Sequence, residues 1–427
     1  MKIAIVGSGI AGNTVAYHLH KEHDITLFEA NDYIGGHTHT HQLNLHGEQQ
    51  NVDSGFIVFN QQTYPNFLNL INELGVAYQE STMSFSVQCE KTGLVYNGSS
   101  FDQLFTQRRN FFKPSFYRMV FDILRFNKES LSILEKDNFE QTLGEYLAEN
   151  RYSQSFIHQY IVPMGAAIWS TGHNTMLDFP AQFFVRFFNN HGMLQIANRP
   201  QWYVIKNGSA EYTKPLTEPF KDKIRLSCKV QNIRRQNNKV FIKARGCEEE
   251  SFDYVFLACH SNQALAMLEN PSPEEIRTLS AIPYTNNKAI IHYDDSILPV
   301  RKKAWAAWNY HLTKNTDCPV MITYNMNILQ SLKSQHTFCV TLNPTDEIDE
   351  SKILKEINYS HPLFTLDGIK AQKNQPLING HLNTYYCGAY WRYGFHEDGV
   401  VSALNAIKKY NQDIGNEQQN LLWSPAA

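Results

Sequence analysis

The chain has 427 residues, of which 42% are hydrophobic and 13% aromatic, and its formal net charge is −3. This length is far above the size at which a hydrophobic core is marginal, and it predicts two closely joined domains. The slightly acidic balance gives no support for a nucleic-acid partner. The seven cysteines show no Cys-x-x-Cys spacing, which favours a reducing compartment with neither a disulfide framework nor a metal site.

Apolar runs long enough for a membrane are absent from the sequence. No window approaches the ~18 uninterrupted apolar residues that a spanning helix needs. The apolar run at residues 3–6 is too short for a signal peptide, and the segment 421–425 is too short for an anchor. We therefore expect a cytoplasmic protein.

The first forty residues predict a β-α-β unit with a dinucleotide-binding fingerprint. Residues 2–6 are typical of a buried parallel strand, and residues 13–21 have the pattern of a helix. The loop between them, predicted to cradle a pyrophosphate, consists of Gly7, Ser8, Gly9, Ile10, Ala11 and Gly12. Gly7 allows the tight turn, Gly9 lets the phosphates approach the backbone, and Gly12 lets the helix pack closely on the strand. The free N–H groups at the helix start favour the phosphate charge.

An acidic residue follows the second predicted strand. The β-branched and aromatic run at residues 25–28 ends in Glu29, 22 residues after Gly7, and Ala30 and Asn31 come next. A carboxylate in that place accepts hydrogen bonds from ribose hydroxyls and disfavours a 2′-phosphate, and with it NADP. A glycine-rich turn in an ordinary α/β domain is the alternative. It is less favoured because the first strand, the helix, the second strand and the acid all have the spacing of the fingerprint.

Two further glycine motifs follow the acid. They comprise Gly35, Gly36, His37 and Thr38, and then Asp53, Gly55 and Phe56. Together they resemble the flavin amine oxidase superfamily, whose pattern is Glu-Ala, a spacer, Gly-Gly-Arg-x-x-Thr and Asp-x-Gly. The resemblance implies that FAD is bound, with the glycine pair close to the ribityl chain and phosphates and the Asp53 turn against the isoalloxazine. His37 stands where the superfamily usually has arginine, so a bidentate phosphate contact is missing there.

The same resemblance assigns cofactor contacts far along the chain. Val230 matches a valine that contacts adenine through its backbone. Residues 384–390 have the pattern of a strand that ends at Gly388, and this glycine with Ala389 would contact the ribityl phosphate, although an acid often stands at the second position. Residues 393–404 begin a predicted helix that continues to about residue 410. Its N-terminus, with Gly399 and Val400, would point its dipole at the flavin pyrimidine and stabilise the reduced flavin.

Two residues are candidates for catalysis. Lys288 heads a predicted strand at residues 286–293 and shares one face with Ile290 and His292. In many amine oxidases a lysine in a comparable place holds a water against flavin N5, and a buried lysine there would have a depressed pKa. The alternative is a solvated lysine at a strand end. His396, at the start of the C-terminal helix, is the candidate for proton transfer.

The predicted fold is α/β, a Rossmann-like FAD-binding domain of the amine oxidase type with a mixed-sheet and helical substrate domain. The FAD-binding domain would comprise residues 1–75, 201–270 and 376–427, and the substrate domain residues 76–200 and 271–375. Apolar spacing also predicts helices at residues 64–75, 139–147 and 183–192, and strands at residues 56–60, 305–310 and 321–327.

Residues 105–126 are aromatic and basic, with four cations and no acid between positions 108 and 121. One interpretation is a cap helix whose arginine stems cover apolar surface. The other is a peripheral membrane contact that admits a lipid. The cap helix is favoured because Pro114 would break the stripe.

The resemblance extends to the segments 163–170 and 394–399 and becomes specific to a bacterial branch usually described as FAD-dependent oxidoreductases. Members of this branch often accompany cyclopropane fatty-acid synthase-like methyltransferases. This implies a small hydrophobic substrate, such as a fatty-acyl lipid, that gives a hydride to flavin N5. Three alternatives stay open: an amine oxidase with an aromatic cage drawn in part from Tyr390, Tyr393 and Phe395, a carotenoid-type isomerase or desaturase, and a non-catalytic flavin-binding partner of a lipid methyltransferase.

Overall fold

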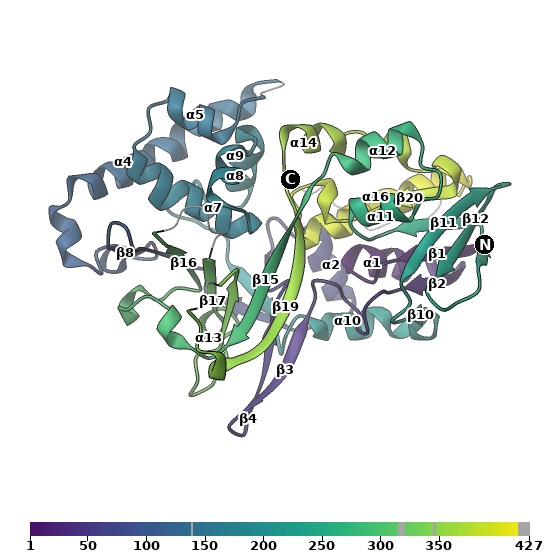
Figure 1. Cartoon of the computed structure of the whole chain (residues 1–427), viewed down its shortest axis with the longest axis horizontal. Helices are drawn as coiled ribbons and strands as arrows, with labels where there is room; N and C mark the ends of the chain where they lie inside the picture. Colours follow the sequence, from purple (N-terminus) through teal and green to yellow (C-terminus); the bar gives the residue numbers. More distant parts are fainter. Residues whose placement is uncertain (138–139, 315–320, 345–346, 417–427) are drawn as a thin grey trace.

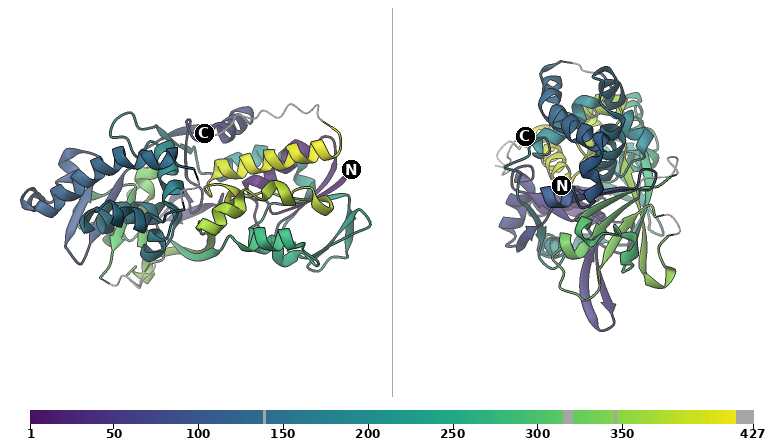
Figure 2. Two further views of the ribbon diagram at one scale, coloured as in Figure 1. Left: turned by 90° about the horizontal axis from the view of Figure 1, so that it is seen from above. Right: turned by 90° about the vertical axis from the view of Figure 1, so that its left-hand side faces the viewer.

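The computed structural model describes residues 1–137, 140–314, 321–344 and 347–416. The molecule is elongated, and its two ends differ in architecture (Figures 1 and 2). One end is built on a parallel sheet that includes the N-terminal strand, and the other is built on a mixed sheet covered by helices. The two long strands β15 (Tyr284–His292) and β19 (Ile353–Pro362) run between the ends (Figure 1).

The parallel sheet has five strands in the order β10-β2-β1-β14-β20. Their bounds are Ile224–Arg225, Asp24–Phe28, Lys2–Val6, Tyr254–Leu257 and Thr384–Tyr386. In the register of the sheet Val6 lies beside both Phe28 and Leu257, and Leu257 lies beside Tyr386. Because these strands end level with one another, the residues that follow them meet at one edge of the sheet.

Both faces of the parallel sheet are covered, which explains why its strands are apolar at successive positions. Ile3 and Ile5 pack against the helices α1 (Ile10–Leu19) and α16 (His396–Asp413). Ala4 and Val6 pack on the other side against an antiparallel sheet of three strands. These strands are β11 (Val230–Gln236), β12 (Lys239–Ala244) and β13 (Glu250–Phe252).

The second sheet has seven strands in the order β19-β15-β18-β17-β16-β7-β8. Beyond β15 and β19, its strands are β18 (Cys339–Leu342), β17 (Met321–Asn325), β16 (Trp308–Leu312), β7 (Phe85–Cys89) and β8 (Leu94–Asn97). All neighbours are antiparallel except β16 and β7, so the sheet is mixed. Its apolar face and the helices that cover it form the largest core cluster.

Two small antiparallel sheets complete the β-structure. One is the hairpin β3 (Thr40–Leu45) and β4 (Glu48–Asp53), and the other has the order β5-β9-β6, from Val58–Asn60, Trp202–Ile205 and Tyr78–Ser81. The remaining α-helices are α2 (Pro65–Glu73), α3 (Phe101–Leu104), α4 (Pro114–Glu129), α5 (Leu143–Glu149), α6 (Gln154–Phe156), α7 (Val162–Trp169), α8 (His173–Leu177), α9 (Ala181–Asn190), α10 (Ala210–Thr217), α11 (Ser261–Met267), α12 (Pro273–Ser280), α13 (Met326–Leu329), α14 (Leu366–Gln372) and α15 (Gln375–Ile378).

The element types predicted above match these elements, and several boundaries differ. The first helix begins at Ile10 and not at Asn13, because Gly9 is already its extended N-cap. Pro114 divides the aromatic stretch as predicted: residues 108–112 form a short 3-10 helix, Lys113 is extended, and Pro114 occupies the first turn of α4, where its missing N–H costs nothing. The helix predicted at residues 139–147 begins at Leu143, and Phe139 and the segment 421–425 lie outside the described residues.

Within the described ranges, no helix is long and apolar enough to cross a membrane. No group of three or more His, Cys, Asp or Glu side chains in the same ranges is arranged to hold a metal ion. The four boundaries between the five domain segments proposed from the sequence stay predictions. The parallel sheet takes strands from three separated stretches of the chain, with the seven-stranded sheet inserted between them.

Candidate active site

The glycine-rich loop after β1 has the geometry of a phosphate cradle. Gly7 has φ +103°, a conformation that other residues rarely adopt, and a Cβ on Gly12 would lie 1.8 Å from the Gly7 carbonyl oxygen. A Cβ on Gly9, in contrast, would meet no protein atom within 4 Å. Gly7 and Gly12 are thus required by the fold itself, whereas the space in front of Gly9 is open at the N-terminus of α1.

The second glycine pair packs directly on this loop. Gly9 and Gly35 form a parallel β-bridge, and the Gly35 N–H donates to the Ser8 carbonyl at 3.0 Å. Gly36, at φ +60°, comes so close that a Cβ would lie 3.3 Å from the Gly9 Cα. The two motifs therefore form one continuous glycine surface, with Ile10 and Ala11 buried behind it in the first turn of α1.

Glu29 closes one side of this surface. Its buried carboxylate accepts hydrogen bonds from the Ser8 N–H at 2.9 Å, the Ser8 hydroxyl at 2.7 Å and the Asn31 N–H at 2.8 Å. Ala30 and Asn31 are exposed beside it. The backbone of the next strand lies alongside, because the Cys228 N–H donates to the Glu29 carbonyl at 2.7 Å, and this places buried Val230 two residues further on.

The C-terminal helix brings a second helix N-terminus to the same edge. A Cβ on Gly399 would lie 2.6 Å from Ile10 Cγ2, so the first turns of α16 and α1 are in contact. Val400 is buried beside Ile10 in the same cluster. The Gly388 N–H donates to the Ser402 hydroxyl at 2.8 Å, which holds Gly388 and Ala389, just after β20, beside the first two turns of α16.

His37 lies half-buried between the glycine pair and β19. Its ring is 4.9 Å from the Tyr359 ring and 5.3 Å from the His361 ring, centroid to centroid. Burial lowers the pKa of His37 to about 4 and that of His361 to about 3, so both rings are neutral near pH 7. His37 Nε2 is buried and makes no hydrogen bond within the described part of the chain. A neutral polar group therefore stands where the family usually has the fixed charge of an arginine.

The Asp53 side chain anchors the turn that the sequence predicts against the flavin. Its side chain accepts from the Ser209 N–H at 2.9 Å, the Ser209 hydroxyl at 2.9 Å and the Gln330 amide at 2.8 Å, and also from Thr40. Burial raises the pKa of Asp53 to about 6, and these hydrogen bonds oppose the shift. The carboxylate thus joins four segments of the chain and holds the turn in place.

The residues after Asp53 do reach the glycine surface. A Cβ on Gly55 would lie 2.1 Å from the His37 carbonyl oxygen, so the turn packs against the second glycine motif. The Phe56 ring stacks on His396 with centroids 3.6 Å apart and planes 7° apart.

His396 is the predicted catalytic residue that the fold brings to the site. Its Nε2 lies 2.6 Å from the Tyr212 hydroxyl and 3.2 Å from Thr38 Oγ1, and these two hydroxyls are 2.6 Å apart. Burial lowers the pKa of His396 well below its ordinary value, which keeps the ring neutral. Three segments thus meet in one hydrogen-bonded group beside the N-terminus of α16. Tyr212 was not singled out from the sequence, because a tyrosine on a helix has no local signal for this role.

Lys288 is not brought to the site. Its side chain is 48% exposed and forms an ion pair with Glu356 at 2.9 Å, on the solvent side of the two long strands. The neighbours Asn287 and Ala289 point the other way and are buried. This contradicts the expectation of a buried lysine beside the cofactor, and it matches the solvated alternative. On the inner face, Asn287 Nδ2 lies 2.9 Å from His361 Nδ1.

A wall of aromatic side chains stands beside the start of α16. Phe395 stacks on Phe187 of α9 with centroids 4.9 Å apart, and Tyr393 lies 4.6 Å from Phe183. The Trp169 indole N–H donates to the Tyr393 carbonyl at 3.2 Å. The motif around Trp169 and the motif around Phe395, far apart in sequence, therefore meet at this wall.

Comparison with known proteins decides the family. A family model described as flavin containing amine oxidoreductase matches residues 10–318. The chain belongs to this family. A 1-hydroxycarotenoid 3,4-desaturase from Flavobacterium sp. is 28% identical over 219 residues, which cover 50% of this chain. The match spans 41% of the length of that relative.

Solved structures show the same fold over nearly the whole chain. A CLA-producing fatty acid isomerase from P. acnes has a TM-score of 0.70 at 16% identity, covering 96% of this chain and 98% of that one. Cyclohexylamine oxidase from Brevibacterium oxydans has a TM-score of 0.71 at 14% identity, covering 97% of this chain and 99% of that one. At these identities the likeness shows the fold alone.

Membership of the family makes the protein a flavin-dependent oxidoreductase, and FAD is the flavin that the sequence predicts. The site fits this cofactor on its own geometry. The site lies beyond the carboxyl ends of the parallel strands and contains the two glycine motifs, Glu29 and the N-termini of α1 and α16. It is at the point of the sheet where β2 pairs with β1 on one side and β14 pairs with it on the other. The open space over Gly9 and the unpartnered His37 Nε2 are both at this place.

Proposed function

We propose that this flavoenzyme removes hydrogen from a carbon of a hydrophobic, lipid-type substrate. The observation that supports this most directly is the aromatic wall next to the N-terminus of α16. Its members are Trp169, Phe183, Phe187, Tyr393 and Phe395. A substrate that reaches this end of the site meets apolar rings, which favour hydrocarbon over a hydrated charge.

The acids beside the wall are already committed to the backbone. Glu397 accepts from the Phe67 N–H at 2.8 Å and from the Asn66 N–H at 3.1 Å, and so caps α2. Asp398 accepts from the Phe395 N–H at 2.9 Å and lies 3.7 Å from the Arg392 guanidinium. A protonated amine needs a carboxylate or an aromatic cage, and both carboxylates here are used elsewhere.

The cage considered for an amine substrate is also incomplete. Tyr393 and Phe395 belong to the core cluster of the helical end, whereas Tyr390 belongs to the cluster behind the parallel sheet, beside Trp391. Tyr390 is therefore removed from the candidate cage. Among similar proteins, the names of the fatty acid isomerase and the carotenoid desaturase refer to hydrophobic substrates, and that of cyclohexylamine oxidase refers to an amine.

The protein's own part in this reaction is binding, orientation and polarity. Bound FAD supplies the acceptor for the hydride. The dipole of α16, directed at its N-terminus, favours negative charge at that end of the site. In our proposal His396, held neutral and fixed by Tyr212 and Thr38, orders the polar edge of the site, and the aromatic wall keeps water away from the reacting carbon.

The test is anaerobic mixing of the FAD-loaded protein with fatty-acyl lipids and, separately, with primary amines. The proposal expects the yellow flavin absorption to bleach with a lipid and the lipid to gain a double bond. Bleaching by amines alone would assign an amine oxidase and overturn the proposal. Rearranged lipid with no net oxidation would assign an isomerase, which the likeness to the fatty acid isomerase makes the second candidate.

A further inference from the structure

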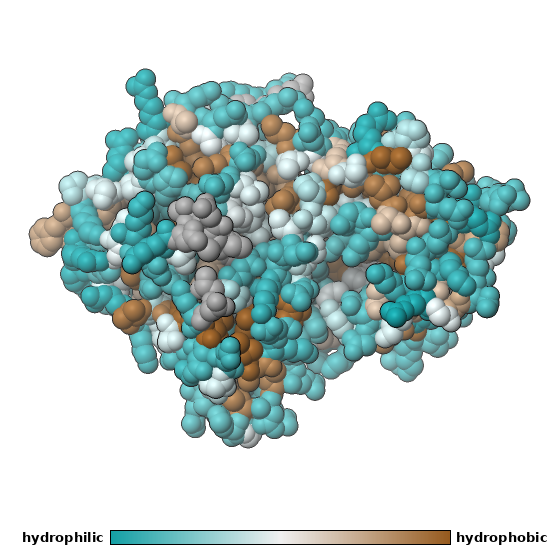
Figure 3. Space-filling model, in the orientation of Figure 1, coloured by the Kyte–Doolittle hydropathy of each residue, from teal (hydrophilic) through white to brown (hydrophobic). Residues whose placement is uncertain are grey.

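Large apolar side chains are exposed at the helical end of the molecule more densely than elsewhere. Thirteen such side chains are exposed in the described residues, and six of them fall between positions 101 and 131. These six are Phe101, Phe112, Tyr117, Phe121, Leu124 and Leu131. They include every exposed phenylalanine of the described chain, and Phe112 is 88% exposed. Apolar side chains reach the surface among hydrophilic ones at this end (Figure 3). A concentration of this kind marks a contact surface.

The helix α4 is apolar on both of its sides. Its inner side buries Phe116, Met119 and Phe126, and its outer side exposes Tyr117, Phe121 and Leu124 at helical spacing. A surface helix ordinarily turns polar residues outward, and a helix that is apolar all round is buried. The outer side of α4 therefore has the character of a surface that is covered when the protein is in place.

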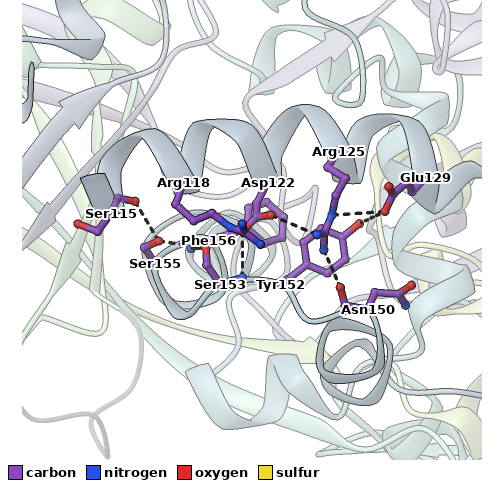
Figure 4. Close-up of polar contacts among 10 residues, drawn as sticks. All are labelled: Ser115, Arg118, Asp122, Arg125, Glu129, Asn150, Tyr152, Ser153, Ser155 and Phe156. Carbon is purple, nitrogen blue, oxygen red and sulfur yellow. Dashed lines mark hydrogen bonds and ion pairs between the residues drawn. The ribbon is translucent and has the colours of Figure 1, made fainter. Parts of the chain in front are cut away.

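Polar contacts on the inner side fix the rotation of α4. Asp122 is fully buried and accepts from the Ser153 N–H at 2.9 Å and from Arg118 Nε at 3.3 Å (Figure 4). The Arg125 guanidinium lies 3.9 Å from the centre of the Tyr152 ring, and its Nη2 donates to the Asn150 carbonyl at 2.7 Å. Because these contacts hold the inner side, the exposed aromatic residues cannot be withdrawn by turning the helix.

The charge around the exposed side chains is positive. Residues 101–131 contain six basic and three acidic residues, in a chain whose formal net charge is −3. Each of the acids is engaged: Asp102 by Arg108, Asp122 by Arg118 and Glu129 by Arg125. Lys113 and Lys128 form no ion pair with any described residue.

A second basic segment lies against the first. Lys303 forms an ion pair with Asp102 of α3, which places the loop at residues 300–303 beside that helix. This loop has the sequence Val-Arg-Lys-Lys, all four residues are exposed, and Val300 is 89% exposed. Like residues 101–131, this loop therefore combines an exposed apolar side chain with several cations.

We infer that this surface, residues 101–131 with the loop 300–303, docks on an anionic lipid bilayer. Aromatic and aliphatic side chains enter the interface between headgroups and acyl chains, while neighbouring cations meet the anionic headgroups. A second copy of the chain is the less suitable occupant, because a two-fold interface would bring the same positive surface onto itself. The inference concerns binding alone and does not depend on the identity of the substrate.

The experiment measures sedimentation of the FAD-loaded protein with vesicles of phosphatidylcholine, with and without phosphatidylglycerol. The wild-type protein should bind the anionic vesicles, and added salt should weaken the binding. The double variant F112S/F121S should bind at least about tenfold more weakly. Loss of two cations in K113Q/K128Q should weaken binding about 25-fold, at about fivefold for each charge. The matched control I276S/L377S replaces exposed apolar residues on α12 and α15, at the other end of the molecule, and should bind like the wild type.

Absence of binding by the wild type, or equal binding by F112S/F121S and the control, would overturn the inference. Light scattering that shows a wild-type dimer and a monomeric F112S/F121S would also overturn it and assign the surface to self-association. Flavin absorption and the melting temperature report whether each variant is folded. If F112S/F121S fails to fold, the charge variant decides alone, because Lys128 is exposed and Lys113 is only half-buried. None of these readings requires turnover.

Discussion

Two glycines of the same fingerprint should respond to the same substitution in opposite ways. Gly9→Ala adds a methyl group where no protein atom lies within 4 Å, and the backbone of Gly9, at φ −66° and ψ 178°, accommodates alanine. Gly12→Ala adds one 1.8 Å from the Gly7 carbonyl oxygen. The methyl group of Gly9→Ala lies in the space predicted for the cofactor, whereas that of Gly12→Ala clashes with the protein backbone.

The magnitudes follow from these positions. Apoprotein carrying Gly9→Ala should unfold within about 1 kcal/mol of the wild type, since glycine and alanine differ modestly as N-caps. A methyl group that displaces the pyrophosphate from one charge-assisted hydrogen bond, worth about 1.5–3 kcal/mol, should weaken FAD binding about 10- to 150-fold. Gly12→Ala should destabilise the apoprotein by about 3 kcal/mol or more, at the upper end of overpacking.

The assay pairs two measurements on deflavinated protein: denaturant unfolding, and titration with FAD followed by quenching of flavin fluorescence. Wild-type affinity in Gly9→Ala would refute the placement of the pyrophosphate over Gly9. If Gly9→Ala destabilises the apoprotein as much as Gly12→Ala does, the conclusion that Gly9 borders the cofactor and Gly12 borders the protein is refuted.

Three further predictions concern the start of α16 and the rejected lysine. Burial raises the pKa of Asp398 to about 7 from 3.8, so its stabilising contribution is present below about pH 4 and is lost as the pH rises through 7. In denaturant unfolding, Asp398→Asn should therefore be more stable than the wild type by up to about 4 kcal/mol at pH 8 and by almost nothing at pH 4. A stability difference that does not change with pH would contradict this. Glu397→Ala leaves the first N–H groups of α2 without their acceptor and should lower the free energy of unfolding by at least about 2 kcal/mol. The exposed control Glu356→Ala should lower it by less than about 1 kcal/mol. Equal losses would refute the cap. Lys288→Met should leave the rates of flavin reduction and reoxidation within about twofold in stopped-flow traces, and a drop of tenfold or more would restore the lysine to the reaction.

The cofactor-binding half of the site is predictable from the sequence because its determinants are local. The turn at Gly7, the helix start after Gly9 and the acid at the end of the second strand follow from residues that are neighbours along the chain. Parallel pairing then brings Glu29 to the loop, since Val6 and Phe28 lie side by side in the register. The same local patterns predict other elements to within a few residues, such as α9 and β15, whereas the β3–β4 hairpin was not predicted.

The direction in which a side chain points is set by packing between distant segments. Alternation along β15 shows that Lys288 and Asn287 lie on opposite faces, but which face meets the site depends on the partner strand and on the covering layers. Asp53 has the motif of a flavin-binding turn, and only the meeting of Ser209 and Gln330 with its carboxylate reveals a residue used inside the protein. His361 of β19 reaches His37 in the same way, across more than three hundred residues.

The outer face of α4 depends on both the local sequence pattern and long-range packing. The order of aromatic and basic residues in 105–126 already indicates two possible roles, a covered helix or a lipid contact. Pro114 divides this stretch in the fold, where it starts α4 after a short 3-10 helix, and exposed aromatic residues lie on both sides of the break. Buried Asp122 then settles which side faces inward, because a carboxylate must find donors within the protein while aromatic rings can remain outside. Local chemistry thus specifies the elements and the dinucleotide loop, and long-range packing specifies which side chains meet the cofactor and which meet the surroundings.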